Sequence, residues 1–190
     1  LTDPCLLVTM PDWLSATTGL DALTHGVEAY VSRAASFLTD EHALMAVRLV
    51  GRHLARSVLA PQDAVARTGM ARASLTAGLA FTNAILGAAH AISHQIGGAL
   101  DLPHGMCNAI LLPHVVRFNA AADPQRFRAL AEALDVRDAA LLPEDEVGEA
   151  LARQISELAA ARQTLDDACL TTNPRAVDER DVTAILLAAL

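Results

Sequence analysis

Apolar residues recur at helical spacing along most of the chain. Leu20, Leu23, Val27 and Tyr30 are three or four residues apart, which places them on one face of a first helix. Similar spacing predicts further helices over residues 43–49, 61–79, 81–96, 106–118, 127–134 and 147–158. We therefore expect an all-α domain in which amphipathic helices pack as a bundle.

Capping and helix-breaking residues indicate where several of these helices begin and end. We expect Thr39 and Asp40 to cap the second helix and Pro61 to start the third. The fourth helix is expected to stop at Gly97 and Gly98. Pro113 is expected to kink or divide the fifth, because proline cannot donate the backbone hydrogen bond of a helix interior.

A few segments lack this helical spacing of apolar residues. They are a short strand over 6–10, loops at 101–103 and 138–146, a break at 172–174, and an abrupt change of character over 159–164. After the break, Asp178 is expected to cap a last helix that ends at Leu190.

Composition is that of a globular domain. The 190 residues are 53% hydrophobic and 19% charged, enough to build one sizeable core. The net charge is −8, which makes nucleic acid or an anionic membrane a poor partner. All 14 basic residues are arginine, so a lysine Schiff base and a P-loop lysine are excluded.

The cysteines and the chain start bear on location. Cys5, Cys107 and Cys169 are odd in number and show no CxxC spacing, which predicts reduced thiols in a cytoplasmic protein. No apolar run approaches the roughly 20 residues of a membrane span, and no signal peptide is visible. Because the chain opens at Leu1 without a methionine, we expect it to be part of something longer.

The spacing of the histidines indicates a metal site. Asp21 and His25 are four residues apart, so on a helix both side chains lie on one face. His90 and His94 repeat this spacing, and His104 follows in a Pro-His-Gly loop. Imidazole suits Zn²⁺ or Fe²⁺, and a carboxylate adds a harder ligand. One Asp with two or three His would leave a coordination position open for substrate.

Plainer interpretations exist for each residue. Asp21 fits a capping box that begins at Thr18, His25 fits a half-buried histidine, and His104 fits a turn residue. Two imidazoles on the apolar helix around His90 and His94 are costly unless each finds a partner. The pattern as a whole favours a metal site, but spacing does not choose between these two histidines. The remaining histidines are interpreted as solvated or locally hydrogen-bonded: His42, His53 and His114.

Four motifs carry a resemblance to a known family. They are TGLDALTHGVEAYVS (18–32), AGLAFTNAILGAAHAISHQIGG (77–98), DLPHGMCNAILLPHVVRFN (101–119) and TTNPR (171–175). Their order and spacing resemble the iron-containing (group III) alcohol dehydrogenases over nearly the whole chain. The resemblance implies the helical metal-binding domain of a two-domain enzyme whose other half is an α/β nucleotide-binding domain.

The resemblance also implies roles for particular residues. The metal ligands of the family fall on Asp21, His25, His90 and His104, whereas His94 lies near the nicotinamide and takes part in proton transfer. Phe81 is expected to line the cleft, with a plain core role as the alternative. The implied cofactors are Fe²⁺ or Zn²⁺ and NAD or NADP, the substrates small primary alcohols or aldehydes, and the assembly a homodimer or larger homo-oligomer.

Some features depart from the family pattern. The chain has no Gly-Gly-Gly-Ser loop for a pyrophosphate, so the nucleotide-binding domain is expected to be absent from residues 1–190. The segment near 159–164 is shorter than usual, and 35–37 replaces a frequent Asn-Pro. The intact Asp21 argues against the maleylacetate reductases. The alternatives are a glycerol dehydrogenase-like or dehydroquinate synthase-like member, or a non-catalytic helical fragment.

Overall fold

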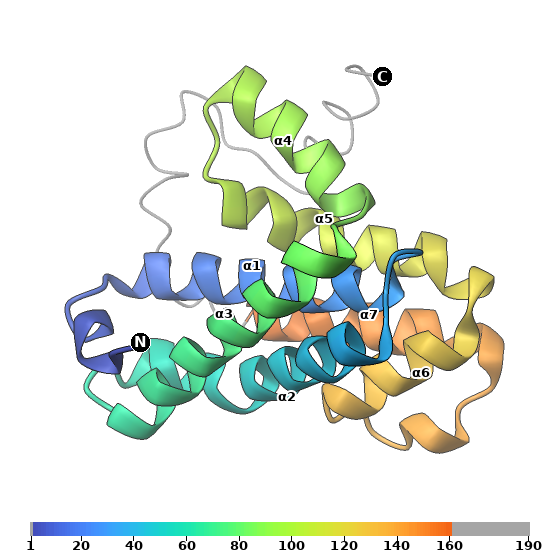
Figure 1. Cartoon of the computed structure of the whole chain (residues 1–190), viewed down its shortest axis with the longest axis horizontal. Helices are drawn as coiled ribbons and strands as arrows, with labels where there is room; N and C mark the ends of the chain where they lie inside the picture. Colours follow the sequence, from blue (N-terminus) through green and yellow to red (C-terminus); the bar gives the residue numbers. More distant parts are fainter. Residues whose placement is uncertain (1, 161–190) are drawn as a thin grey trace.

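All regular elements in the described part of the chain are helical. The computed structural model describes residues 2–160 (Figure 1). Its elements are η1 (Pro4–Leu7), α1 (Asp12–Val31), α2 (Phe37–Leu59), α3 (Ala64–Ala84), α4 (Ala88–Leu100), α5 (His104–Asn119), η2 (Ala120–Ala122), α6 (Pro124–Ala133), η3 (Ala139–Leu141) and α7 (Glu144–Ala160). The all-α prediction is therefore confirmed.

Helix α1 lies at the centre of the arrangement. It packs against α2 and α3 on one side and against α5 on another, and α5 in turn packs on α7. Leu20, Leu23 and Val27 of α1 are fully or almost fully buried, as their helical spacing predicts. Because α1 contacts both halves of the bundle, residues on its buried face can meet residues from distant parts of the sequence.

Helix α4 stands apart from the bundle. Only Ala89, His90 and Ser93 of its residues are buried, and it packs mainly on α5. It rises from the other helices in Figure 1, and its axis makes an angle of 101° with that of α3. The corner holds Ile85 at φ 63° and ψ −178°, a backbone conformation that a β-branched residue rarely adopts. The site-bearing end of α4 is thus its buried, N-terminal turn.

The predictions for residues 6–10 and for the start of the second helix are wrong, because residues other than the predicted ones cap these elements. Residues 6–10 form no strand, since Asp3 caps a 3₁₀ turn at Pro4–Leu7 through a 2.9 Å bond from the Cys5 amide. Ser36, not Thr39 or Asp40, caps α2, and Thr39 completes the capping box by accepting from the Ser36 amide at 2.7 Å.

Later boundaries also differ from the prediction. Pro61 precedes α3, which Asp63 caps at 2.9 Å to the Val65 and Ala66 amides. Residues 81–96 are not one helix, because the chain turns at 85–87 between α3 and α4. Helix α4 continues past Gly97 and Gly98 to Leu100. Helix α5 continues through Pro113 undivided, although proline has no backbone N–H to donate to the preceding turn.

The loop predicted at 138–146 is shorter than expected. It contains the η3 turn, Ala139 within it is buried, and α7 begins at Glu144. The helices predicted from Phe127 and from Val147 are confirmed as α6 and α7. The predicted break at 172–174, the last helix capped by Asp178, and positions 161–164 lie outside the described residues.

The described helices are too short or too polar to span a membrane one by one. No single one of them is long and apolar enough to cross a membrane; α3 and α4 reach that length and hydropathy only as a bent pair.

Candidate metal centre

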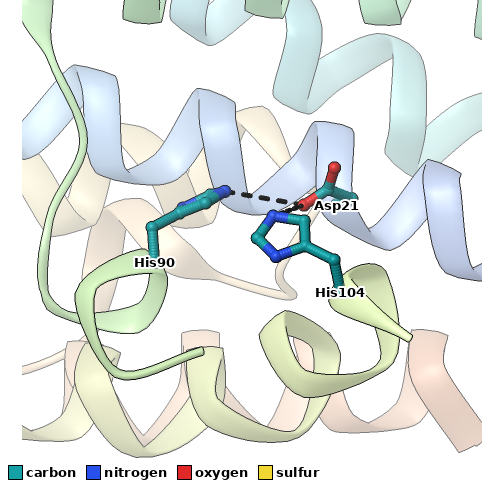
Figure 2. Close-up of side chains that lie close together, drawn as sticks. All are labelled: Asp21, His90 and His104. Atoms are coloured by element: carbon teal, nitrogen blue, oxygen red, sulfur yellow. Dashed lines mark ion pairs between the residues drawn. The ribbon is translucent and has the colours of Figure 1, made fainter. Parts of the chain in front are cut away.

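Three of the predicted ligands converge from three helices. Asp21 comes from α1, His90 from the first turn of α4 and His104 from the first residue of α5 (Figure 2). Asp21 Oδ1 lies 3.5 Å from His90 Nε2 and 3.4 Å from His104 Nε2. One ligand atom from each residue lies within 4.8 Å of the others, close enough for one metal ion to contact all three.

Asp21 is not a helix cap. Helix α1 begins at Asp12, two and a half turns earlier, so the capping-box interpretation of Thr18 and Asp21 is wrong. The Asp21 side chain is 21% exposed and faces the two histidines. Although burial opposes ionisation, hydrogen bonding to His90 and the charge of His25 hold the pKa of Asp21 below its usual value. The centre therefore contains one ionised carboxylate.

His25 lies beside this group and not within it. Its Nδ1 is 3.7 Å from Asp21 Oδ2, and its ring lies 4.4 Å from that of His90. The His25 ring also stacks on Phe81, with centroids 4.4 Å apart. Burial lowers the pKa of His25, which favours the neutral, metal-binding form. Its role as a fourth ligand stays a prediction.

His94 is exposed at the rim of the same cluster. Its ring stacks on that of His104, with centroids 5.2 Å apart and 19° between the planes. It lies further from His90, at 5.9 Å. His104 is 42% exposed, and burial of the remainder lowers its pKa. His94 and His104 thus form the side of the centre that meets solvent.

Asn108 is a member of the cluster that the sequence analysis missed. Its Nδ2 lies 2.7 Å from Asp21 Oδ1, 3.0 Å from His90 Nε2 and 3.0 Å from His104 Nε2. It follows His104 by four residues on α5, the same spacing that singled out His25 and His94. Applying that rule to amides as well as to acids and imidazoles would have found it.

Glu28 is the second residue that was missed. It is 2% exposed in α1, and its Oε2 lies 2.6 Å from His90 Nδ1. An acid seven residues after Asp21, on the helix face that also carries Asp21 and His25, was the available signal. Burial opposes charge on His90, but hydrogen bonds to Asp21 and Glu28 raise its pKa to about 9. Each ring nitrogen of His90 thus faces a carboxylate.

The donor set fits a divalent metal ion. An amide group has two protons, so Asn108 Nδ2 cannot serve three acceptors at once, and Asn108 Oδ1 is buried without a hydrogen-bond partner. A divalent cation can accept lone pairs from all three of Asp21, His90 and His104. Imidazole and carboxylate together are typical of Zn²⁺ and non-haem Fe²⁺ sites.

The other histidines lie away from the centre. His42 and His53 are half-buried in α2, and are not fully solvated as predicted, whereas His114 is exposed on α5. His53 lines a cavity of about 330 Å³ between α2 and α3 with Leu49 and Arg72. None of the predicted site residues lines that cavity, so it is separate from the group formed by Asp21, His90 and His104.

Comparison with known proteins agrees with the family that the sequence motifs resemble. A family model described as the C-terminal part of the Fe-containing alcohol dehydrogenase family matches residues 15–163. This match covers more than half of the chain and includes all four predicted ligands. The chain belongs to the iron-containing alcohol dehydrogenase family.

Relatives within the iron-containing alcohol dehydrogenase family are similar along the whole chain. A 1,3-propanediol dehydrogenase of Klebsiella pneumoniae is 40% identical over 205 residues, covering 97% of this chain and 53% of the relative. An NAD-dependent methanol dehydrogenase of Bacillus methanolicus is 35% identical, covering 100% of this chain and 55% of the relative. The chain spans about half the length of the curated relatives it matches.

A solved structure shows the same helical arrangement. The crystal structure of a 1,3-propanediol oxidoreductase superposes with a TM-score of 0.82 at 38% identity, covering 99% of this chain and 55% of that one. The chain is therefore the C-terminal, helical part of the two-domain dehydrogenase architecture.

Proposed function

We propose that this chain forms the metal-holding part of an enzyme that transfers hydride reversibly between small primary alcohols or aldehydes and NAD or NADP. The observation that carries the proposal is the convergence of Asp21, His90 and His104 from three helices. Membership of the iron-containing alcohol dehydrogenase family supports the reaction type. The names of its relatives, a propanediol and a methanol dehydrogenase, support a small primary alcohol as substrate.

The proposed ligands are Asp21, His25, His90 and His104, holding Fe²⁺ or Zn²⁺. Asp21 supplies one negative charge and the histidines supply neutral nitrogens, so two positive charges of the ion are only half neutralised. A bound ion would supply Lewis-acid chemistry at the oxygen of an alcohol or aldehyde. The centre is suited to the charge that develops on a substrate oxygen.

We propose that His94 relays the proton of the reaction. It is exposed, it stacks on His104, and it is not one of the three converging residues. An exposed imidazole is placed to pass a proton between a substrate and solvent. Phe81, half-buried and stacked on His25, would present an apolar surface beside the substrate and keep water from that side.

The nicotinamide nucleotide would be bound chiefly by an α/β half beyond this chain. The relatives are about twice as long as residues 1–190, and the adjacent glycines here, Gly97 and Gly98, lie inside helix α4. The chain would then supply position and electrostatics, while the cofactor supplies the hydride chemistry. Cytoplasmic location and homo-oligomeric assembly stay predictions.

Metal analysis of the complete protein tests the proposal. We expect about one Fe or Zn per chain, loss of alcohol-dependent NAD(P) reduction on chelation, and recovery when metal is added back. His90→Ala and His104→Ala should each lower bound metal and activity together. His114→Ala, which removes an exposed imidazole from the same helix as His104, is the matched control and should change neither.

His94→Ala separates proton transfer from metal binding. This variant should retain metal but lose turnover or shift its pH profile. Retention of full metal and activity in both His90→Ala and His104→Ala would show that the ligand assignment is wrong. Loss of metal in His94→Ala alone would show that the two histidines of α4 have exchanged roles.

A further inference from the structure

One buried carboxylate joins helix α4 to the metal centre. Glu28 Oε1 accepts from the Ala89 amide at 2.6 Å, and Oε2 lies 2.6 Å from His90 Nδ1 and 3.4 Å from the His90 amide. Glu28 is 2% exposed, and none of these contacts lies on its own helix. Its two oxygens therefore divide between the start of a helix and the ring of a predicted ligand.

Helix α4 has no cap of its own. Its N-cap residue is Gly87, which offers no side chain, and the first turn contains no acidic residue. The amide groups of the first helical turn need acceptors, and a negative charge there also interacts favourably with the helix dipole. Glu28, on α1, supplies both the acceptor and the negative charge. Few residues of α4 are buried, so this contact is one of the few that hold its first turn in place.

Gly87 makes room for this contact. A Cβ atom at position 87 would lie 2.9 Å from Glu28 Oε1 and 3.2 Å from its carboxyl carbon. Any other residue would push the carboxylate away from the Ala89 amide. The φ of Gly87 is −124°, so its conformation is open to other residues and the close approach is what requires glycine.

The contact at Nδ1 decides which nitrogen of His90 is free. An ionised carboxylate only accepts hydrogen bonds, so a proton lies on Nδ1. This leaves Nε2, which faces Asp21, as the nitrogen that binds a metal ion once its own proton is lost. We infer that Glu28 is a positioning residue for the metal centre: it holds His90 in its ligating tautomer and orientation and fixes the start of α4 with the same side chain. This inference rests on the proposed metal site.

Only a carboxylate can perform both tasks. In Glu28→Gln the amide oxygen can face the Ala89 amide or His90 Nδ1, and the NH₂ group is left to face the other donor. If the NH₂ group faces Nδ1, the proton moves to Nε2 and the metal-binding lone pair is lost. If it faces the Ala89 amide, the cap of α4 is lost. The substitution changes shape very little, so its effect reports on hydrogen bonding.

The test uses Zn²⁺ binding by the complete protein, measured by competition with a chromophoric chelator. Loss of the carboxylate partner of a ligating histidine typically weakens metal affinity about 10–100-fold, and we expect a loss in that range for Glu28→Gln. Nitrogen-15 spectra of the Zn²⁺-loaded wild type should show His90 protonated on Nδ1. Gly87→Ala, which keeps the carboxylate but displaces it, should weaken Zn²⁺ binding in the same direction and serves if Glu28→Gln fails to fold.

Gly98→Ala is the matched control on the same helix. A Cβ atom at position 98 has no neighbour within 4 Å, so Zn²⁺ affinity should be unchanged. If the wild type binds Zn²⁺ and both Glu28→Gln and Gly87→Ala bind it equally tightly, Glu28 has only a structural role and the inference is overturned. If the wild type itself binds no Zn²⁺, the proposed function fails, and this inference fails with it.

Discussion

Gly105 lies directly against the backbone of Thr17. A methyl group at position 105 would lie 2.4 Å from the carbonyl oxygen of Thr17 and 2.8 Å from its carbonyl carbon. This contact brings the start of α5, and with it His104, onto the N-terminal half of α1, one turn from Asp21. The glycine of the Pro-His-Gly motif is therefore required by helix packing.

We expect Gly105→Ala to move His104 away from Asp21. Because both contacts are with backbone atoms, α5 must shift, and overpacking of this kind typically costs about 1–3 kcal/mol of unfolding free energy. Zn²⁺ affinity should fall together with the melting temperature. Gly78→Ala on α3 is the control: no atom lies within 4 Å of the added Cβ, and stability should rise by up to about 1 kcal/mol. Unchanged affinity in Gly105→Ala would contradict this account.

Asn108→Asp should make stability depend more strongly on metal. The substitution places a second carboxylate where Nδ2 now lies 2.7 Å from Asp21 Oδ1. Without metal, two acids in contact repel, and a cost of about 1–3 kcal/mol is expected from the lost hydrogen bond alone. With metal, the added charge is neutralised. The difference in melting temperature between Zn²⁺-loaded and chelated protein should therefore widen, and an unchanged difference would count against a cation at this position.

The pH dependence of stability that His90 causes should largely disappear when metal binds. The pKa of folded His90 is about 9 against an ordinary value of 6.5, so its charged form stabilises the chelated protein fully below pH 6.5. That contribution is lost as pH rises from 6.5 towards 9. Metal needs the same nitrogen deprotonated, so apparent affinity should rise by up to about tenfold per pH unit over this window.

Thermal unfolding with chelator and with Zn²⁺, from pH 6 to 9, measures both trends. The chelated protein should lose stability across this range and the loaded protein should gain relative to it. His90→Ala should flatten both curves, since it removes the titrating group. Parallel curves in the wild type would mean that no proton on His90 competes with the metal.

Ile85→Gly should stabilise the fold. Ile85 adopts φ 63° and ψ −178°, a region that is almost restricted to glycine and typically costs about 1–3 kcal/mol for other residues. Its side chain is 68% exposed, so little apolar burial is lost. Glycine adds about 0.5–1 kcal/mol of unfolded-state entropy, leaving a net gain of up to about 2 kcal/mol in denaturant unfolding. Leu86→Gly, at a neighbouring residue without positive φ, should destabilise.

Local patterns in the sequence predicted most of the helices and the candidate ligands, but not the turn at 85–87. Helical periodicity is a property of one segment, so Leu23 and Val27 predicted α1 without knowledge of its neighbours. The same applies to Asp21 and His25, whose four-residue spacing places them on one face. Choosing His90 over His94 required the family resemblance, because both share one helix face.

Tertiary structure decided what approaches these residues. Glu28 and Asn108 reach the centre across helix–helix contacts between residues 62 and 87 positions apart, which no local pattern contains. Beside the turn at 85–87 that separates α3 from α4, Ser32, the residue that follows α1, donates from Oγ to the Ala84 carbonyl at 2.5 Å. The sequence by itself determined that the chain is helical and carries metal-binding side chains. Close packing of α1, α4 and α5 decided which of those side chains meet, because their approach depends on contacts between distant segments.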